Sequence, residues 1–347
     1  MKYMDYAAST PVSSTVSEAM GIWQTECYAN PSAMHYEAEK ASNAIKQARE
    51  IIAEQIGAMP SEIIFTSGAS ESNNLAIKGV AFKHLSDKGH LITSSIEHKC
   101  ILNTCAYLQE LGFEVTYLQP NADGIISAKQ VEDAIRPDTL LISVHHVNNE
   151  LGTIQPIEEI GEVAFDNDIP FHTDAAQSFC KVDIDVDDMN IDMLSLSGHK
   201  IYGPKGIGVL YVRDARESEL IPLIHGGGQE LGLRGGTSPT PLIVGLGAAV
   251  EHFPSEASDQ QVEFEDTISR YCFSRNGGDN VLPTTWNITF ESDDEVKLFT
   301  KERDWLISQG SACNAMSNTP SHVLSAIGLS EEEARRTYRI SLPPYKV

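Results

Sequence analysis

The sequence lacks any hydrophobic run long enough to span a lipid bilayer. Its longest apolar stretches, such as Leu242 to Val250, are far shorter than the roughly 20 residues that a membrane helix needs. The first residues, Met1 to Tyr6, also lack the basic and then apolar pattern of a secretion signal. We therefore expect a soluble, cytoplasmic protein that does not contact a membrane.

Basic residues are scarce as well. The chain has 25 Lys and Arg against 49 Asp and Glu, which gives a formal net charge of −24. Such a surface repels DNA, RNA and anionic lipids, so we expect no direct nucleic-acid binding. A basic protein partner would suit this charge. Acidic stretches such as residues 183–188 can equally serve only to keep the protein in solution or reflect a salty habitat.

Paired cysteine motifs are also absent. The six cysteines are scattered without a Cys-x-x-Cys pair: Cys27, Cys100, Cys105, Cys180, Cys272 and Cys313. This spacing argues against a zinc ribbon and against a disulfide framework. We expect reduced thiols and no metal site.

Short apolar runs that alternate with helical patterns make up much of the chain. The runs end in polar or glycine-rich residues and cover residues 62–66, 90–94, 140–144, 169–172 and 193–196. Strands that alternate with helices indicate βα units and a mainly parallel sheet flanked by helices. Ligands of such sheets bind beyond the carboxyl ends of the strands.

The length of 347 residues allows one large domain and a smaller one. After about residue 245 the pattern changes to weaker helices and a short strand at residues 286–290. We predict an α/β fold with a large domain over residues 13–245. A smaller α+β domain would comprise residues 1–12 and 246–347.

A single lysine, Lys200, follows a Ser-Gly-His turn at the end of an apolar run, and Asp174 follows another run upstream. A strand-end lysine and a carboxylate are the pair that pyridoxal 5'-phosphate requires. The lysine holds the aldehyde carbon as a Schiff base, and the carboxylate keeps the pyridine nitrogen protonated. A Gly-His-Lys turn alone is more often a solvated loop, so the neighbouring motifs decide whether Lys200 holds a cofactor.

Residues 66–74 follow a predicted strand and open a predicted helix. The free amides and hydroxyls of Gly68, Ala69 and Ser70 can hold a phosphate at the positive end of the helix dipole. Ordinary helix capping by a Ser and Gly turn is the alternative.

Three further polar residues lie in loops that follow strands. His98 can stack on a cofactor ring and move protons, or it can be structural. Asn149 and Gln177 are neutral amides that suit a ring oxygen, or they can satisfy buried backbone groups.

Taken together, these motifs resemble a cysteine desulfurase of the pyridoxal-phosphate fold type I, aminotransferase class V group. The matching motifs follow the family's order over nearly the whole chain, at residues 4–11, 30–32, 66–74, 96–99, 147–152, 172–177, 197–206, 234–237 and 310–313. The resemblance implies a fold type I architecture with pyridoxal 5'-phosphate as cofactor.

The resemblance also implies a role for each matching residue. Lys200 would carry the cofactor, Asp174 would pair with the pyridine nitrogen, and His98 would stack on the ring. Gln177 would reach the ring oxygen, and Asn149 and Arg339 would bind the substrate carboxylate. The phosphate would be held by Ala69, Ser70, Ser197 and His199, together with Thr237 of the partner subunit.

Cys313 is the residue that separates a desulfurase from other members of this group. It lies in a small, polar stretch, residues 308–320, whereas the other cysteines have more apolar or helical surroundings. A buried structural thiol is the alternative. The polar stretch resembles the branch of the family whose cysteine sits on an extended loop that carries sulfur outward.

We therefore expect a homodimeric cysteine desulfurase that converts L-cysteine to L-alanine and passes a Cys313 persulfide to an acceptor protein. The alternatives are a selenocysteine lyase, another class V lyase or transaminase, and a catalytically silent scaffold of the same fold. Iron–sulfur clusters, thiolated tRNA, sulfur-modified DNA and cofactor synthesis all stay open as destinations of the sulfur.

Overall fold

The structure is a computed structural model that describes residues 2–302, 305–309 and 321–347. Its centre is a seven-stranded sheet in the order β2-β8-β7-β6-β5-β3-β4. The strands are β2 (Ile63–Thr66), β3 (His90–Ser94), β4 (Glu114–Leu118), β5 (Thr139–Ser143), β6 (Phe171–Asp174), β7 (Met193–Ser197) and β8 (Gly208–Val212). All neighbouring strands pair in parallel except β8, which is antiparallel to both β2 and β7.

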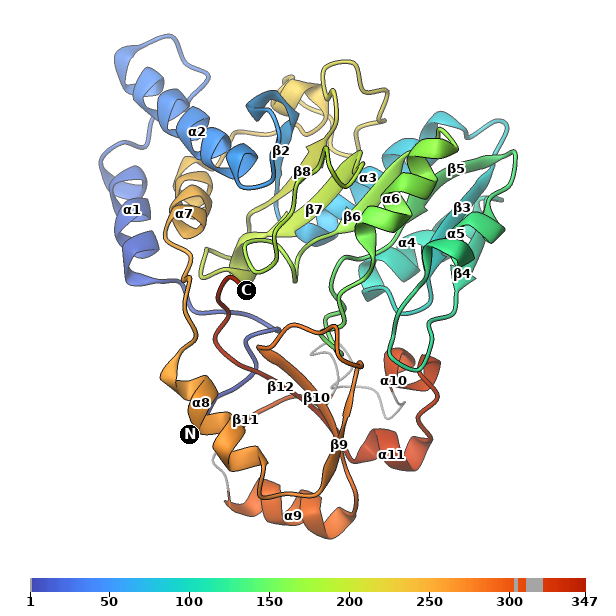
Figure 1. The fold of residues 1–347 in the computed structure, drawn as a ribbon. Coiled ribbons are helices and arrows are strands. Elements are labelled where there is room, and N and C mark those ends of the chain that lie inside the picture. Colours follow the sequence, from blue (N-terminus) through green and yellow to red (C-terminus); the bar gives the residue numbers. More distant parts are fainter. Residues whose placement is uncertain (1, 303–304, 310–320) are drawn as a thin grey trace.

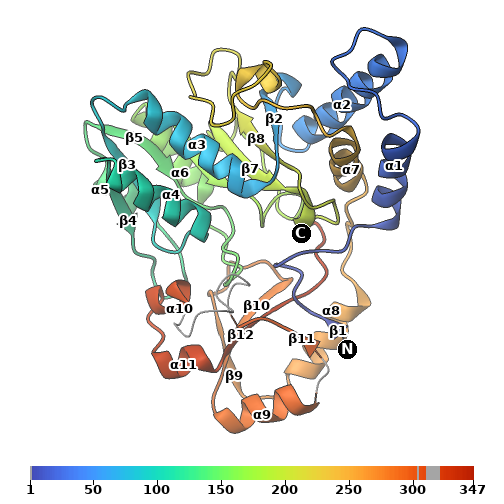
Figure 2. The same ribbon diagram turned by 180° about the vertical axis from the view of Figure 1, so that it is seen from behind.

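Helices cover both faces of this sheet. They are α1 (Ser14–Thr25), α2 (Tyr36–Glu54), α3 (Ala69–Lys83), α4 (Lys99–Glu110), α5 (Ala128–Ala134), α6 (Ile157–Asp166) and α7 (Thr240–Glu251). Helices α3 and α4 lie on one face, and α5 and α6 lie on the other (Figures 1 and 2). Because both faces are covered, all residues of β3, β7 and β8 are buried.

Helix α2 illustrates how the sequence pattern produces this packing. Its apolar residues recur at helical spacing, and Ala41, Ile45, Ala48 and Ile52 are all buried. Helix α7 approaches so closely that a Cβ atom on Gly247 would lie 2.9 Å from the Cβ of Ala48. The apolar stripe of α2 therefore belongs to the core.

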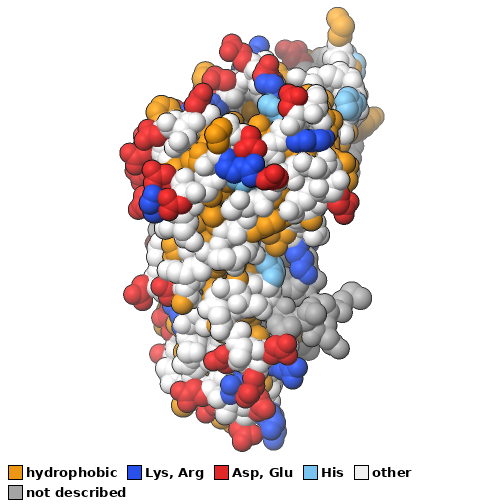
Figure 3. Space-filling model, turned by 90° about the vertical axis from the view of Figure 1, so that its right-hand side faces the viewer, with side chains coloured by type: hydrophobic (Ala, Val, Ile, Leu, Met, Phe, Trp, Pro, Cys, Tyr) orange, Lys and Arg blue, Asp and Glu red, His pale blue; other side chains and the backbone are white. Residues whose placement is uncertain are grey.

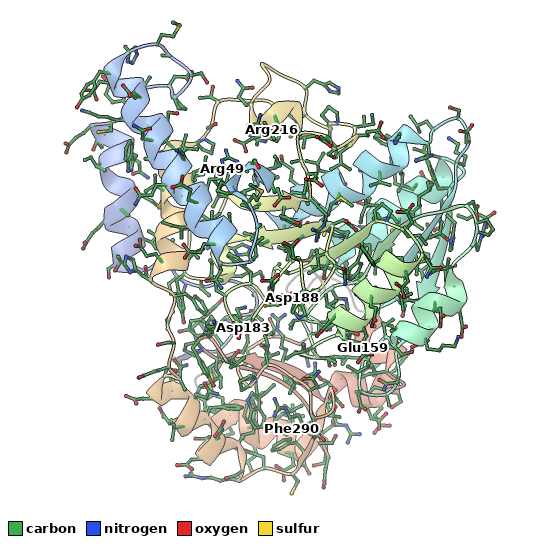
Figure 4. All side chains as sticks on the ribbon, turned by 45° about the horizontal axis from the view of Figure 1, so that its top comes forward. Arg49, Glu159, Asp183, Asp188, Arg216 and Phe290 are labelled. Carbon is green, nitrogen blue, oxygen red and sulfur yellow. The ribbon has the colours of Figure 1, made fainter. Side chains whose placement is uncertain are left out.

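A three-stranded antiparallel sheet, in the order β12-β10-β9, forms a second unit below the first (Figure 1). Its strands and helices are β9 (Phe273–Asn276), β10 (Thr285–Phe290), β12 (Thr337–Ser341), α8 (Asp259–Ile268), α9 (Asp293–Glu302), α10 (His322–Ala326) and α11 (Glu331–Arg335). Phe264, Phe290 and Phe299 form its aromatic core, with Phe290 placed inside this unit in Figure 4.

The first residues of the chain join this second unit. Strand β1 (Lys2–Tyr3) pairs in parallel with β11 (Trp305–Leu306), and Met4 is buried in the same core as Phe290. The chain then crosses to the seven-stranded unit. The predicted limits of the two domains at residues 13 and 246 stay a prediction.

The expected α/β class with a mainly parallel sheet is confirmed, and each predicted strand in the large domain has a counterpart. Strand β4 was missed because it lies at the edge of the sheet and is only partly buried, so it has no continuous apolar run. Short 3₁₀ helices cover Pro60–Glu62, Gly198–Lys200 and Glu230–Gly232.

The described residues include no helix that combines the length and the apolar character needed to cross a bilayer. Figure 3 shows one face of the molecule, on which Asp and Glu side chains are spread over both the upper and the lower parts. The excess of acidic residues is therefore distributed along this face and is not confined to one unit.

Candidate active site

A cavity of about 530 Å³ lies beyond the carboxyl ends of β3, β5, β6 and β7. Loops after these strands line it, together with residues 7–9 near the start of the chain and one residue of β12. The predicted site residues that line it are Ala69, Ser70, His98, Asn149, Asp174, Gln177, Ser197, His199, Lys200 and Arg339. Residues predicted from separate motifs therefore converge in one place.

Lys200 lies in the 3₁₀ turn that follows β7, and its amine lines the cavity. Its Nζ donates hydrogen bonds to the carbonyl oxygens of Ala7 at 2.5 Å and Ala8 at 2.9 Å. These carbonyls belong to the segment that links the two units. The amine is thus held by backbone carbonyls of the linking segment. No local motif around Lys200 could indicate these contacts.

Asp174, the last residue of β6, is 7 % exposed and holds two hydrogen bonds. Its Oδ2 accepts from Nδ2 of Asn73 at 2.7 Å, and its Oδ1 accepts from the amide of Ala176 at 2.9 Å. Asn73 was not among the predicted site residues, although it lies within the motif at residues 66–74. Asn73 lies one turn into α3, and its hydrogen bond orients the carboxylate of Asp174.

Helix α3 begins at Ala69, and residues 67–71 line the cavity. The amides of a first helical turn have no partner within the helix, so they can bind an anion. Strand β8 packs directly under this turn, because a Cβ atom on Gly208 would lie 2.5 Å from the Cα of Gly68. Ser197 and His199 line the same cavity, and a Cβ atom on Gly68 would lie 3.7 Å from Oγ of Ser197.

His98 is the N-cap of α4, and its Nδ1 accepts a hydrogen bond from the amide of Cys100 at 3.2 Å. The proton of the neutral ring therefore resides on Nε2. Burial lowers the pKa of His98, although Asp174 opposes this effect. Near neutral pH the ring is uncharged and exchanges a proton only through Nε2.

His199 is likewise kept neutral. Burial and then the charge of Lys200 lower its pKa to about 4. Its Nδ1 lies 3.2 Å from Oγ of Ser9. A neutral imidazole at this position can donate a hydrogen bond to an anion without adding a second cation next to Lys200.

Arg339 is 1 % exposed on β12, and its guanidinium is anchored on two sides. NH1 donates to the carbonyl oxygen of Asn149 at 2.8 Å, and NH2 lies 2.6 Å from Oδ1 of Asp5. Its Nε has no hydrogen-bond partner among the described residues. The group is therefore held rigidly at the cavity, and these two contacts use two of its five N–H donors.

Among the predicted site residues that the structure describes, Thr237 does not line this cavity, and it is exposed on the glycine-rich loop after β8. Cys313 lies outside the described residues. The segments on either side of it are attached beside the cavity: Ser308 pairs with Arg339 through backbone hydrogen bonds, and Oγ of Ser321 donates to Glu150 at 2.6 Å.

A buried carboxylate and histidine pair also borders the cavity and was not predicted. Oε1 of Glu97 accepts from Nδ1 of His145 at 2.8 Å and from Oγ of Ser94 at 2.6 Å. Burial alone would raise the pKa of Glu97, but His145 and the hydrogen bonds outweigh burial and lower it. Glu97 directly precedes His98 in the sequence, which is the signal that could have drawn attention to it.

The donor set of the cavity fits pyridoxal 5'-phosphate. A helix N-terminus with a hydroxyl and a neutral imidazole suits a phosphate dianion, an amine suits an aldehyde, and a carboxylate suits a pyridinium nitrogen. The structure provides these groups as the start of α3 with Ser197 and His199, as Lys200 and as Asp174. The cavity volume of about 530 Å³ also falls in the usual range for a small-molecule site.

Comparisons with known proteins identify the family of the chain. Residues 2–346 match the family Aminotransferase class-V. The cysteine desulfurase IscS of Rickettsia prowazekii is 44 % identical over 356 aligned positions, which cover 98 % of this chain and 86 % of that protein.

Solved structures are similar over the whole chain. A structure described as SspA in complex with cysteine is 80 % identical, with a TM-score of 0.99 and full coverage of both chains. DndA from Streptomyces lividans is 38 % identical, with a TM-score of 0.81, over 99 % of this chain and 100 % of that one. The chain therefore belongs to the class V aminotransferase family and, within it, to the cysteine desulfurases.

Proposed function

We propose that the protein removes the sulfur of L-cysteine with the help of pyridoxal 5'-phosphate and releases L-alanine. The observation that carries this proposal is the single cavity in which Lys200, Asp174 and the first turn of α3 meet. When bound there, the cofactor draws electrons away from the substrate Cα. The similarity to SspA in complex with cysteine supports L-cysteine as the substrate.

The chain's own residues supply binding, orientation and proton transfer. With the cofactor bound, Lys200 would anchor its aldehyde, Asp174 would pair with the pyridine nitrogen, and Ala69, Ser70, Ser197 and His199 would hold the phosphate. Gln177 and His98 would contact the ring, and His98 would move a proton at Nε2, the ring nitrogen that the Cys100 amide leaves open.

Arg339 and Asn149 bind the substrate carboxylate. The guanidinium is fixed by Asp5 and by the carbonyl oxygen of Asn149, so the substrate meets a preorganised cation. Preorganisation lowers the entropy cost of binding, because a rotamer-rich side chain is already ordered before the substrate arrives.

The thiolate of Cys313 then accepts the sulfur. The Cβ–S bond of cysteine breaks and an S–S bond forms, so cysteine and the Cys313 thiol become alanine and a Cys313 persulfide. The described segments before and after Cys313 are attached at Arg339 and at Glu150, the neighbour of Asn149, which supports access of this thiol to the substrate end of the cavity.

We also propose a homodimer, in which Thr237 of the partner subunit completes the phosphate site, and a protein acceptor for the persulfide sulfur. The exposure of Thr237 outside its own chain's cavity supports the dimer. We place the enzyme in the cytoplasm, because a persulfide carrier works as a reduced thiol and the five cysteines that the structure describes are free.

The proposed function is tested by incubating the cofactor-loaded protein with L-cysteine and measuring alanine. Mass spectrometry of the wild-type protein should show one added sulfur on the peptide that contains Cys313. The Cys313→Ser variant should retain the cofactor and bind cysteine, but sulfur transfer and alanine release should collapse.

The control is Cys272→Ser, which changes an exposed thiol outside the cavity and should leave both measurements unchanged. Alanine release by Cys313→Ser at the wild-type rate, or an added sulfur on another peptide, would refute the role of Cys313. If selenocysteine gives alanine at the same rate as cysteine and no persulfide forms on the protein, the lyase alternative is favoured.

A further inference from the structure

Lys181 is a buried lysine that lies directly behind the cavity. It follows Gln177 by one turn and is 3 % exposed, although lysine is among the residues least often buried completely. Its Nζ donates a hydrogen bond to Oε1 of Gln177 at 3.4 Å. No carboxylate among the described residues lies within ion-pair distance of it.

Gln177 connects this lysine to the amine at the centre of the site. Its Nε2 donates to the carbonyl oxygen of Ala7 at 2.9 Å, and the same oxygen accepts from Nζ of Lys200 at 2.5 Å. Lys181, Gln177, Ala7 and Lys200 therefore form a continuous series of hydrogen bonds.

A side-chain amide has one end that accepts and one end that donates hydrogen bonds. In its protonated form Lys181 can only donate, so it binds the oxygen end of Gln177 and leaves the NH₂ end toward Ala7 and the cavity. Without Lys181 only the Ala7 carbonyl would hold this orientation, and a rotated amide would present its oxygen lone pairs instead. The NH₂ end suits a bound anionic oxygen, whereas the oxygen end would repel it.

The surroundings of Lys181 show why its charge also matters for the site. Its titratable neighbours include Lys200, Cys180 and His199. Burial and then the charge of Lys200 lower the pKa of Lys181 to about 7, whereas the Cys180 thiol opposes this effect. The positive charge of Lys181 contributes in turn to the low pKa of His199, after the larger effects of burial, Lys200 and Lys205. Lys346 lies near Cys180 but is paired with Asp183 at the surface.

We propose that Lys181 is a positioning residue of this site: its ammonium group fixes the orientation of the Gln177 amide, so that a hydrogen-bond donor faces the cavity beside Lys200. The inference rests on the proposed function, because it assigns this donor to an anionic oxygen of the bound cofactor. Lys181 itself does not line the cavity, so it acts through Gln177.

The test compares wild-type holoenzyme with Lys181→Met, which removes the donor and keeps the side-chain length, and with Lys181→Arg, which keeps a donor. Two readouts do not depend on turnover: the dissociation constant of pyridoxal 5'-phosphate and the midpoint of the pH titration of the holoenzyme's visible absorbance. We expect Lys181→Met to weaken cofactor binding about tenfold and to shift the midpoint, and we expect Lys181→Arg to restore much of both.

A double-mutant cycle with Gln177→Leu shows whether Lys181 acts through Gln177. Gln177→Leu alone should give a similar loss, and the double variant should lose little more than either single variant. Additive losses, or an unchanged midpoint and affinity in Lys181→Met, would overturn the inference. If Lys181→Met does not fold, the other two variants carry the test. The inference is then overturned if Lys181→Arg differs from wild type in both readouts while Gln177→Leu does not.

Lys346→Met is the matched control, because this lysine also lies near Cys180 but forms an exposed ion pair with Asp183 at 2.7 Å. It should leave both readouts unchanged, and a shift equal to that of Lys181→Met would overturn the inference. The proposed function is judged separately by alanine release from wild-type protein. Absorbance shifts in Lys181→Met without alanine release by the wild type would support the inference and refute the function.

Discussion

Replacing Lys181 by methionine should change how the stability of the protein depends on pH. Burial, followed by the charge of Lys200, lowers the pKa of Lys181 from its usual 10.5 to about 7 in the folded protein. Between these two values the unfolded chain binds a proton that the folded protein does not bind. The free energy of unfolding therefore rises with pH across this window, and the lysine destabilises the fold below it.

The expected size follows from the difference in bound protons. Above the folded pKa, this difference approaches one proton, and each pH unit then adds about 1.4 kcal/mol to the free energy of unfolding. Integration between about pH 7 and pH 9 gives a gain of about 2 kcal/mol for wild type relative to Lys181→Met. A lysine with an ordinary pKa would give almost no change over the same range.

The assay is equilibrium urea unfolding of cofactor-free protein at several pH values and one protein concentration. The free energy of unfolding of Lys181→Met minus that of wild type should be larger near pH 6.5 than near pH 9, because the variant has no charge to bury. Lys346→Met provides the control, since its half-exposed ammonium is paired with Asp183. If the wild-type and Lys181→Met curves stay parallel over this range, the folded protein does not depress the pKa of Lys181 and the reasoning is refuted.

Two further substitutions probe the support of the cavity. Gly208→Ala would place a Cβ atom 2.5 Å from the backbone of Gly68, so it should cost about 1–3 kcal/mol of stability and weaken cofactor binding. Gly21→Ala, with nothing within 4 Å, should be neutral or stabilising, and similar losses in both variants by urea unfolding would contradict the close-packing argument. Asn73→Leu removes the 2.7 Å hydrogen bond to Asp174 and should weaken cofactor binding by about 1–3 kcal/mol, measured by titration. Unchanged affinity would show that the Asp174 carboxylate needs no such support.

The sequence by itself determined the sheet and the residues at its edge. Parallel strands interrupted by helices place their carboxyl ends together, so the residues that follow each run can be assigned to one site without knowledge of the packing. Asp174 and Lys200 were found in this way, because Asp174 ends the buried strand β6 and Lys200 lies in the short turn after the buried strand β7. The edge strand β4 escaped detection because one face of an edge strand needs little hydrophobicity.

Only the tertiary structure decided how these residues are supported. The carbonyl of Ala7 reaches Lys200 across 193 positions of the chain, and Asp5 reaches Arg339 across 334, so no local pattern could reveal either contact. Lys181 lies between a cysteine and a valine in a stretch that also contains acidic residues, where a lysine would ordinarily face solvent. Its burial, and the pKa that follows from it, depend on the water excluded by surrounding segments, which is a property of packing and not of local sequence.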